Sequence, residues 1–372
     1  MADYRCMGVN EVLNASGTLT RLGGSLMDPE VLEAMRQAAG SFVDMNELLQ
    51  KSGEYLAALL GVGGVLVVNG AAAGMMVAIS ACIAGRDQAR IRSLPDFGNS
   101  VEEIIVFKSH RNLYDQALRQ TGARLREIGL SDFAFEWDLR SAFNEHTRAV
   151  VYYAEFEEAP GSLPLDMVIR IAKEFRVPVI VDAAAELPPV ENLWKYYLAG
   201  AGLVLFSGGK DLHGPQAAAL LIGDRELIET CRLNACPNYS IGRPCKAGKE
   251  EIVGMVTAVE RYLKQDFAAR YRNWESQVAT FQTAMAKVEG TNARRVFPGT
   301  DYIRPSVIPR VYFELPKTCS LTMDQFEQAL LKHNPAVVLA KEKQTFIFNP
   351  HVLPLGQEAL VAECVVELLT KK

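Results

Sequence analysis

The sequence lacks a Cys-x-x-Cys pair, although it contains seven cysteines. They are scattered and odd in number, at positions 6, 82, 231, 236, 245, 319 and 364. Such spacing is typical neither of a disulfide framework nor of a zinc site, so we expect reduced thiols and no bound metal. Even the closest group, Cys231, Cys236 and Cys245, matches no ligand pattern.

Net positive charge is also absent. The net charge is −5 at pH 7 and no long basic run occurs, so the electrostatic surface of a nucleic-acid-binding protein is missing. The first ten residues contain charged side chains and no apolar core of a secretion signal. These absences predict a cytoplasmic protein without a nucleic-acid partner.

A membrane-spanning segment is not expected either. The stretch from Gly61 to Gly85 carries no charge and is long enough to cross a bilayer. However, it contains Asn69, several glycines and few large side chains, a pattern that favours a buried strand, a turn and a buried helix. We therefore expect no membrane partner.

Short β-branched runs instead alternate with amphipathic helices through the first two thirds of the chain. The expected strands cover residues 65–68, 104–107, 124–128, 149–153, 179–181 and 203–206. The expected helices between them include residues 112–121, 165–175 and 193–199, and residues 217–222 are expected to return antiparallel. Apolar strands separated by helices predict an α/β fold with a mainly parallel sheet that is covered on both faces.

The length of 372 residues allows two domains, and the pattern divides accordingly. Residues 1–30 resemble an irregular N-terminal arm that joins the small domain and the active site, and residues 31–249 form a large domain. Residues 250–372 are expected to form a smaller α+β domain, with helices at 250–265, 266–288, 323–332 and from 356, and strands at 307–313 and 345–349.

Lys210 follows one of these strands directly, after the turn Ser207-Gly-Gly. A lysine held beyond a buried strand, where glycines allow close backbone approach, is suited to Schiff-base chemistry, although a surface lysine in a turn has the same local pattern. Asp182 ends the preceding strand, 28 residues earlier. An aspartate and a lysine at this spacing are what a pyridoxal 5′-phosphate enzyme needs, the carboxylate for the pyridine nitrogen and the amine for the aldehyde. The alternative for Asp182 is a helix N-cap.

A phosphate site is expected where the first of these strands opens into a helix. Gly70, Ala71, Ala72, Ala73 and Gly74 provide small residues at a helix N-terminus, where unpaired N–H groups favour an anion. The hydroxyl of Ser207 is placed to add a further donor. Small residues that only allow tight helix packing would give the same pattern.

Four segments together resemble the family of selenocysteine-synthase-related pyridoxal phosphate enzymes, and most of all the branch that includes D-glucosaminate-6-phosphate ammonia-lyase. They are Asn14-Ala-Ser-Gly-Thr-Leu-Thr20, Asn69-Gly-Ala-Ala-Ala-Gly74, Ser207-Gly-Gly-Lys-Asp-Leu-His-Gly-Pro-Gln216 and Ile241-Gly-Arg-Pro-Cys-Lys-Ala-Gly-Lys-Glu250. The resemblance covers nearly the whole chain. It implies the fold of aspartate aminotransferase (fold type I), with Lys210 as the Schiff-base lysine, Asp182 as the partner of the pyridine nitrogen and His110 as the residue that stacks on the cofactor. A histidine that merely caps the following helix is the alternative for His110.

The resemblance also implies an activity, the elimination of a β-hydroxyl and ammonia from an amino acid or amino sugar acid to leave a 2-oxo-3-deoxy acid. Other pyridoxal phosphate reactions (aldolase, racemase, transaminase, or sulfur or selenium transfer) and a non-catalytic or tRNA-associated role are the alternatives. Because the chain is acidic and begins almost directly at Asn14, transfer on tRNA fits poorly. A homo-oligomer, at least a dimer, is implied by the resemblance alone.

Substrate recognition is expected from five residues at four places. Arg21 in the N-terminal arm and Arg310, directly before Val311–Phe313 in an expected strand, are candidates for a bidentate contact with a carboxylate. Arg243 and Lys246 lie on a glycine-containing loop that would suit a substrate phosphate or the cofactor of a neighbouring subunit. His213, three residues after Lys210, occupies a position that varies within the family, so we expect it to influence the choice of substrate. A plain surface role is the alternative for the three arginines and for Lys246.

Overall fold

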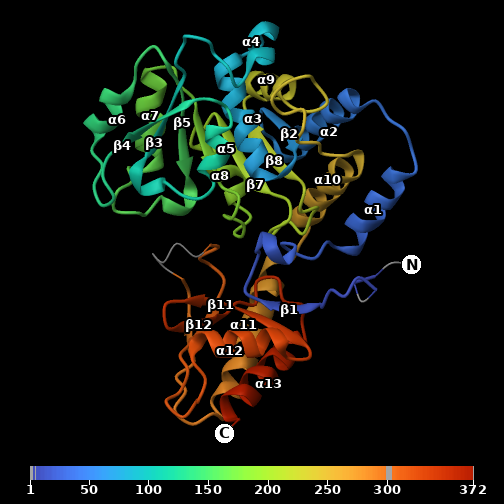
Figure 1. Cartoon of the computed structure of the whole chain (residues 1–372). Helices are drawn as coiled ribbons and strands as arrows, with labels where there is room; N and C mark the ends of the chain where they lie inside the picture. The colour runs from blue at the N-terminus through green and yellow to red at the C-terminus, as the bar shows by residue number, and fades with distance from the viewer. Residues whose placement is uncertain (1–2, 5, 299–303, 372) are drawn as a thin grey trace. The chain divides into compact units, whose positions relative to one another are not determined.

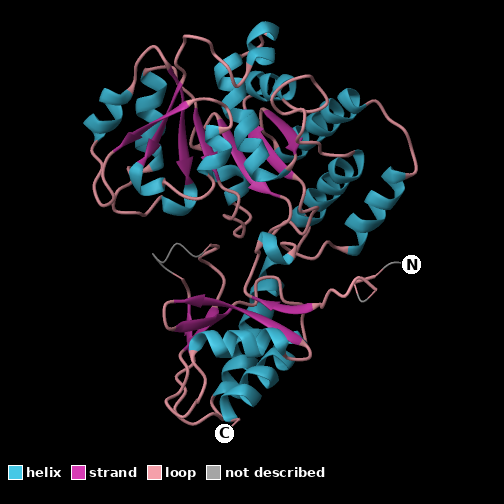
Figure 2. Ribbon diagram, in the orientation of Figure 1, coloured by secondary structure: helices cyan, strands magenta, loops and turns pink. Residues whose placement is uncertain are grey.

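The computed structural model describes residues 3–4, 6–298 and 304–371, and the chain folds into two compact units (Figures 1 and 2). The larger unit comprises Met27–Lys264. The smaller unit combines Met1–Leu26 with Gln265–Lys372. Each unit has its own sheet and its own buried core, so each is described separately.

The larger unit is built on a seven-stranded sheet in the order β2-β8-β7-β6-β5-β3-β4. Its strands are β2 (Gly64–Val68), β3 (Glu103–Phe107), β4 (Arg124–Ile128), β5 (Thr147–Tyr153), β6 (Val179–Asp182), β7 (Leu203–Ser207) and β8 (Ala219–Gly223). Neighbouring strands are parallel except that β8 pairs antiparallel with both β2 and β7. The other strands therefore share one direction, and their last residues meet at one side of the sheet, which we call the carboxyl edge. The opposite side is the amino edge.

Helices cover both faces of this sheet in the larger unit, as Figure 2 shows. They are α1 (Pro29–Ala39), α2 (Met45–Leu60), α3 (Gly70–Ala84), α4 (Gln88–Ser93), α5 (Asp115–Arg119), α6 (Glu136–Ala142), α7 (Leu165–Glu174), α8 (Asn192–Leu198), α9 (Arg225–Asn234) and α10 (Lys249–Leu263). Two 3-10 turns, η2 (Lys108–His110) and η3 (Ala154–Phe156), directly follow β3 and β5. Strands buried on both faces need such cover, which explains why they read as continuous apolar runs.

The uncharged stretch that includes α3 lies inside this unit. Strand β2 is buried along its whole length, and α3 is buried from Gly74 through Ala81. A Cβ built on Gly74 would lie 2.5 Å from Cδ2 of Leu205 in β7 and 2.8 Å from Cγ2 of Val68, so only glycine lets α3 approach this closely. Among the described residues, no helix combines the length and hydropathy needed to cross a membrane.

The smaller unit contains a five-stranded sheet in the order β1-β11-β12-β10-β9. Its strands are β1 (Val12–Ala15), β9 (Arg294–Val296), β10 (Arg310–Phe313), β11 (Ala336–Glu342) and β12 (Thr345–Phe348), and its helices are η1 (Thr20–Leu22), α11 (Phe267–Met285), α12 (Met323–Lys332) and α13 (Gln357–Thr370). The rings of Phe281 and Phe348 stack 4.3 Å apart between centroids in its core. The N-terminal segment belongs here because β1 pairs in parallel with β11.

Three features differ from the sequence-based expectation. The segment before residue 30, expected to be irregular, contains β1, and β11 was not anticipated; the pairing of β1 with β11 is a long-range contact without a local signal. The helix at 250–265 was assigned to the small domain, whereas α10 packs on α1, α2 and β2 and belongs to the larger unit. The boundary therefore lies near residue 264 rather than 249. The helix expected at 112–121 is shorter, since α5 begins only at Asp115.

Candidate active site

The polar residues that follow the parallel strands meet at the carboxyl edge. Asp182 is the last residue of β6, Ser207 is the last residue of β7, and Lys210 lies in the turn that follows β7. Asp182 is in register with Leu205 on the neighbouring strand. Ligands bind at this edge in parallel α/β sheets. The fold therefore brings Asp182 and Lys210 to one place although 27 residues separate them in the sequence.

Lys210 lies in an environment that favours its neutral amine. Burial lowers the pKa of its ammonium group, while the charges of Asp182, Glu155 and Glu186 act in the opposite direction. The net direction is downward. A lysine amine whose pKa is lowered carries its lone pair in a larger fraction of molecules at neutral pH, as a nucleophile or a general base requires.

Asp182 shows the complementary effect. Burial raises the pKa of its carboxyl group, and the backbone N–H of Ala184, 2.9 Å from Oδ1, and the charge of Lys210 only partly offset this. A buried carboxylate is stabilised by an additional cation close by. The protonated nitrogen of a pyridine ring is a cation of suitable size, so Asp182 fits the predicted role.

The turn that carries Lys210 is held by close backbone packing. A Cβ on Gly208 would lie 2.7 Å from Sδ of Met255, and one on Gly209 would lie 2.5 Å from Cα of Gln216. The next residue, Asp211, is 1% exposed and accepts a 2.6 Å hydrogen bond from the hydroxyl of Tyr262 in α10. These contacts fix the backbone on both sides of Lys210, which favours a positioned amine over a flexible surface lysine.

The N-terminus of α3 is where the phosphate site is predicted. Gly70 opens the helix at a φ of 69°, and its first turn contains no acidic residue. The side chain of Asn69 does not cap the helix but donates a 2.6 Å hydrogen bond to the carbonyl of Lys246. The first N–H groups of α3 therefore have no side-chain cap and remain suited to an anion. Through Asn69, the loop that carries Lys246 lies beside them.

His110 is more deeply placed than the sequence indicates. Its ring is completely buried, with Nε2 3.0 Å from Oγ of Ser162 and Nδ1 accepting a hydrogen bond from the backbone N–H of Tyr153. The ring of Tyr152 lies 4.8 Å away between centroids. Burial lowers the pKa of His110 to about 4, so the imidazole is neutral near pH 7. The structure places His110 beside the last residues of β5, and its stacking on a cofactor stays a prediction.

The five predicted substrate residues fall in both units. His213, Arg243 and Lys246 belong to the larger unit; His213 has a φ of 51° and its N–H donates to the carbonyl of Lys210. Arg21 and Arg310 belong to the smaller unit. Their substrate contacts stay predictions.

Arg310 is 0% exposed, its guanidinium donates to the carbonyls of Arg304 and Pro305, and burial lowers its pKa to about 10. Lys249, the first residue of α10 directly after the loop that carries Lys246, donates to the carbonyls of Ala38 and Ala39 and so holds the C-terminus of α1.

Two residues of this edge were missed by the sequence-based selection. Glu186 is 7% exposed and its charge acts on Lys210, and the only sequence signal was a single acid within an apolar stretch four residues after Asp182. Tyr153, the last residue of β5, is in register with Asp182. A tyrosine at the end of an apolar strand gives no signal by itself.

Comparison with known proteins identifies the family. A model of the L-seryl-tRNA selenium transferase (SelA) family matches residues 12–273. The D-glucosaminate-6-phosphate ammonia lyase of Salmonella typhimurium is 34% identical over 264 residues, which cover 70% of this chain and 69% of that protein. The chain belongs to the SelA family.

Other members of the family differ in reaction. A 5′-C-glycyluridine monooxygenase-decarboxylase of a Streptomyces species is 35% identical over 300 residues, which cover 78% of this chain and 73% of that protein. The L-seryl-tRNA(Sec) selenium transferase of Carboxydothermus hydrogenoformans is 24% identical over 383 residues, 91% of this chain and 77% of that protein. Family membership alone therefore leaves more than one reaction to consider.

Solved structures agree with the fold. A structure of D-glucosaminate-6-phosphate ammonia-lyase has a TM-score of 0.84, is 28% identical and covers 99% of both chains. An aspartate aminotransferase of Thermus thermophilus has a TM-score of 0.56 at 15% identity, with 97% of this chain and 99% of that chain covered, which shows the shared fold. The predicted family and fold type I are confirmed, and the prediction of a pyridoxal phosphate-dependent ammonia-lyase agrees with the enzyme that both the sequence and the structure comparison name.

The cofactor of this enzyme is pyridoxal 5′-phosphate, and the site fits it. Lys210 would provide the amine, Asp182 the carboxylate for the ring nitrogen, and the uncapped start of α3 the phosphate donors. In addition, two buried hydroxyls at this edge have no hydrogen-bond partner among the described residues. They belong to Ser109, which follows β3, and to Tyr153, the last residue of β5. Among the same residues, no group of His, Cys, Asp or Glu could hold a metal ion.

Proposed function

We propose that the enzyme eliminates a β-hydroxyl and ammonia from an amino sugar acid, with D-glucosaminate 6-phosphate as the first candidate, to give a 2-oxo-3-deoxy acid. The observation that carries this proposal is the gathering of Lys210 and Asp182 at the carboxyl edge, in a chain that resembles an ammonia-lyase of that substrate over 99% of its length in structure. The 34% sequence identity supports the same substrate class.

The reaction depends on residues that bind, orient and transfer protons. When bound, pyridoxal phosphate withdraws electrons from the α carbon of an amino acid and so makes its proton acidic. The Asp182 carboxylate would hold the ring nitrogen, and the N–H groups of residues 70–74 with the hydroxyl of Ser207 would hold the phosphate. The amine of Lys210, with its pKa lowered by burial, is suited to take the proton from the α carbon.

Loss of the β-hydroxyl requires a proton for the departing oxygen. Glu155 and Glu186 both act electrostatically on Lys210, so both lie near enough to be considered. Lys210 itself, after accepting the α proton, is a third source. The hydroxyl leaves as water, and hydrolysis of the resulting enamine or imine by one water molecule then releases ammonia and the 2-oxo acid.

A phosphorylated and carboxylated substrate requires cationic partners. Lys246, whose carbonyl is bound by Asn69 at the start of α3, is the predicted contact for a substrate phosphate together with Arg243. Arg21 and Arg310 are proposed for the carboxylate, and His213 for the sugar-acid hydroxyls, because its N–H is bound to the carbonyl of Lys210. Arginine binds carboxylate through two parallel hydrogen bonds, which lysine cannot provide.

One specific observation favours a second function. The 35% identity to a monooxygenase-decarboxylase is as high as that to the ammonia-lyase. An oxidative decarboxylation would consume oxygen and release carbon dioxide from a glycyl group. Product analysis with D-glucosaminate 6-phosphate and with a glycyl nucleoside, with oxygen uptake recorded, separates the two reactions.

The deciding experiment is a Lys210→Ala variant beside the wild type. The wild type, loaded with cofactor, should absorb in the near-visible range and release ammonia and a 2-oxo acid in equal amounts. Lys210→Ala should lose the absorbance band, because the amine that binds the cofactor is absent. Its rate should fall about 10²- to 10⁴-fold, because the general base is absent. Lys173→Ala, an exposed lysine of α7, is the control and should behave as the wild type. Carbon dioxide release without ammonia would refute the lyase.

A homo-oligomer and a cytoplasmic location belong to the same proposal. They are supported by the resemblance of the chain to its family and by the absence of a membrane-spanning helix among the described residues. Sedimentation of the loaded enzyme tests the first, with a dimer or larger assembly expected. Fractionation of the source cells tests the second.

A further inference from the structure

The hydroxyl of Tyr153 has no assigned role in the candidate active site. Tyr153 is the last residue of β5 and only 3% of it is exposed. Its hydroxyl is buried and has no hydrogen-bond partner among the described residues. Such a group is rare in folded proteins, because an unmade hydrogen bond in the interior is costly, and it calls for a partner.

The hydroxyl lies at the candidate active site. Tyr153 is the register partner of Asp182 on the neighbouring strand β6, and paired residues project to the same face of a sheet. The charges of Asp182 and Glu155 act on the Tyr153 hydroxyl, and the same two charges act on the Lys210 amine. Tyr153 and Lys210 therefore share two acidic neighbours.

The strand order indicates which part of the cofactor Tyr153 faces. Strands β7, β6 and β5 are consecutive, so Asp182 lies between the strand that leads to Lys210 and the strand that ends in Tyr153. The first turns of α3 lie on the β7 side, because Gly74 packs on Leu205 of β7 and Val68 of β2. Tyr153 is on the opposite side of Asp182 from the phosphate site.

The pyridoxal ring has a matching asymmetry. One ring carbon carries the phosphate arm and another carries the phenolic oxygen, and these two carbons flank the ring carbon that carries the aldehyde. They therefore lie on opposite sides of the line that joins this carbon to the ring nitrogen. If the nitrogen is at Asp182 and the phosphate at α3, the oxygen is directed toward β5. The deep burial of the phenol, followed by the nearby acidic groups, raises the pKa of Tyr153, so its hydroxyl keeps the proton and acts as a donor.

We propose that Tyr153 is a cofactor-binding residue whose hydroxyl donates a hydrogen bond to the phenolic oxygen of pyridoxal phosphate. The inference rests on the cofactor site of the proposed function and on neither its substrate nor its reaction. A hydrogen bond to this oxygen adjusts the electron distribution of the ring, so its loss should be visible in the absorbance of the bound cofactor.

The test is Tyr153→Phe, which removes a single oxygen atom. The loaded variant should show a shifted near-visible absorbance maximum, and dilution of the loaded enzyme should give a cofactor Kd raised about five- to tenfold, the effect of one hydrogen bond. Ser80→Ala is the matched control. It also removes a buried hydroxyl without a partner among the described residues, but from the interior of α3, and both readouts should stay at the wild-type value.

A cofactor analogue provides a second measurement that needs no variant. The wild type should bind 3-deoxypyridoxal 5′-phosphate about five- to tenfold more weakly than the natural cofactor, and Tyr153→Phe should bind both equally. Three results would each overturn the proposal. They are an unchanged absorbance and Kd in Tyr153→Phe, equal binding of both cofactors by the wild type, and the same absorbance shift in Ser80→Ala. Because no readout requires substrate, an enzyme that passes these tests but releases no ammonia refutes only the lyase.

Discussion

Both edges of the large sheet carry buried acidic residues, but the surroundings of these residues differ between the edges. At the amino edge, Glu102 and Glu103 are 4% and 5% exposed. At the carboxyl edge, Glu186 is 7% exposed and Asp182 is partly buried, and the charges of both act on Lys210. The same chemical groups at the two ends of the same strands allow a direct comparison.

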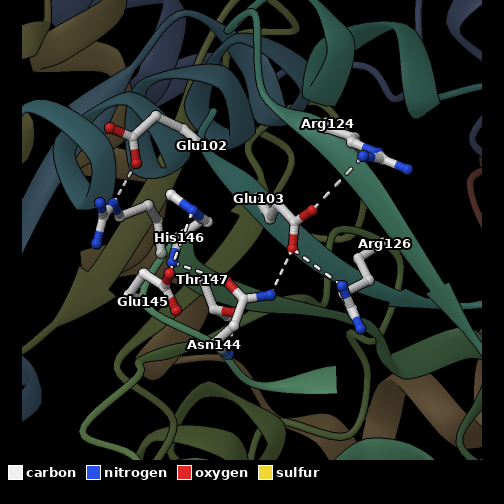
Figure 3. A network of polar contacts seen from close by, with 9 residues as sticks. Glu102, Glu103, Arg124, Arg126, Asn144, Glu145, His146 and Thr147 are labelled. Atoms are coloured by element: carbon white, nitrogen blue, oxygen red, sulfur yellow. Dashed lines mark hydrogen bonds and ion pairs between the residues drawn. The ribbon is translucent and has the colours of Figure 1, made fainter. Parts of the chain in front are cut away.

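The amino edge is a network in which each carboxylate is paired (Figure 3). Glu103, the first residue of β3, accepts a 2.8 Å hydrogen bond from the side chain of Asn144 and forms ion pairs with Arg126 and Arg124. Glu102 is bound by Arg90, at 2.7 Å, and by Arg148. Here the buried charge is compensated by neighbouring strands, which ties their starting points together.

The carboxyl edge is not compensated in this way. Burial raises the pKa of Asp182 and lowers that of Lys210, and the hydroxyls of Tyr153 and Ser109 have no partner among the described residues. Shifted pKa values and unmade hydrogen bonds gather where a ligand completes the set. The comparison therefore distinguishes carboxylates that stabilise the fold, at the amino edge, from charged groups that are candidates for catalysis, at the carboxyl edge.

Asp182→Asn should produce the largest effect and sharpen this contrast. Without the negative charge beside the ring nitrogen, kcat of the loaded enzyme should fall about 10²- to 10³-fold. Thermal stability should stay the same or rise, because a buried carboxylate with a raised pKa is removed. Asp166→Asn, on the exposed side of α7, is the control. A variant with full activity and lower stability would place Asp182 with the amino-edge residues.

Glu103→Gln should show the reverse pattern. Two arginines lose their common partner, so urea denaturation should report a loss of about 1–3 kcal/mol in the free energy of unfolding. The kcat of the folded, loaded variant should equal that of the wild type, because the network lies at the opposite end of the strands. Reduced kcat at unchanged stability would break the distinction between the edges.

His110→Gln should have a smaller effect that depends on pH. The folded protein holds the His110 pKa at about 4 and the unfolded chain near 6.5, so the unfolded state binds the additional proton between these values. Stability is therefore complete above the unfolded pKa and is lost as the pH falls through this window. Between about pH 7 and about pH 5 this amounts to about 2 kcal/mol.

Denaturation curves of the two proteins at both pH values measure the difference. The wild type should lose more stability than His110→Gln, while His146→Gln, at the partly exposed amino edge, should keep the wild-type dependence. Equal pH dependence in wild type and His110→Gln would mean that burial does not hold the imidazole neutral.

The sequence predicted the strands of the large sheet well because all of them except β4, which contains Arg124, Arg126 and Glu127, are local apolar runs that end in polar or glycine residues. It also predicted that Asp182 and Lys210 follow adjacent strands. It did not predict β1, since the pairing of Val12–Ala15 with β11 joins segments more than 300 residues apart. Helix α10 was assigned to the wrong unit for the same reason, as its contacts with α1 are absent from any local pattern.

The candidate site divides in the same way. Lys210, Asp182 and the glycines of α3 were recognisable because their chemistry depends on residue type and spacing, which the sequence displays. Tyr153 and Glu186 were not recognisable, because what distinguishes them is burial next to Asp182 and Lys210. The tertiary structure also gave Lys249 a structural role at the end of α1, although its sequence neighbours are candidates for phosphate binding.

The sequence by itself determined the order of strands and helices, the candidates for the reactive lysine and its aspartate, and the family resemblance, because all three are properties of short segments. The tertiary structure decided which buried polar groups are paired and which are not. That distinction depends on distances between strands and on exclusion of water. Both arise only when the sheet assembles and its two edges acquire different neighbours.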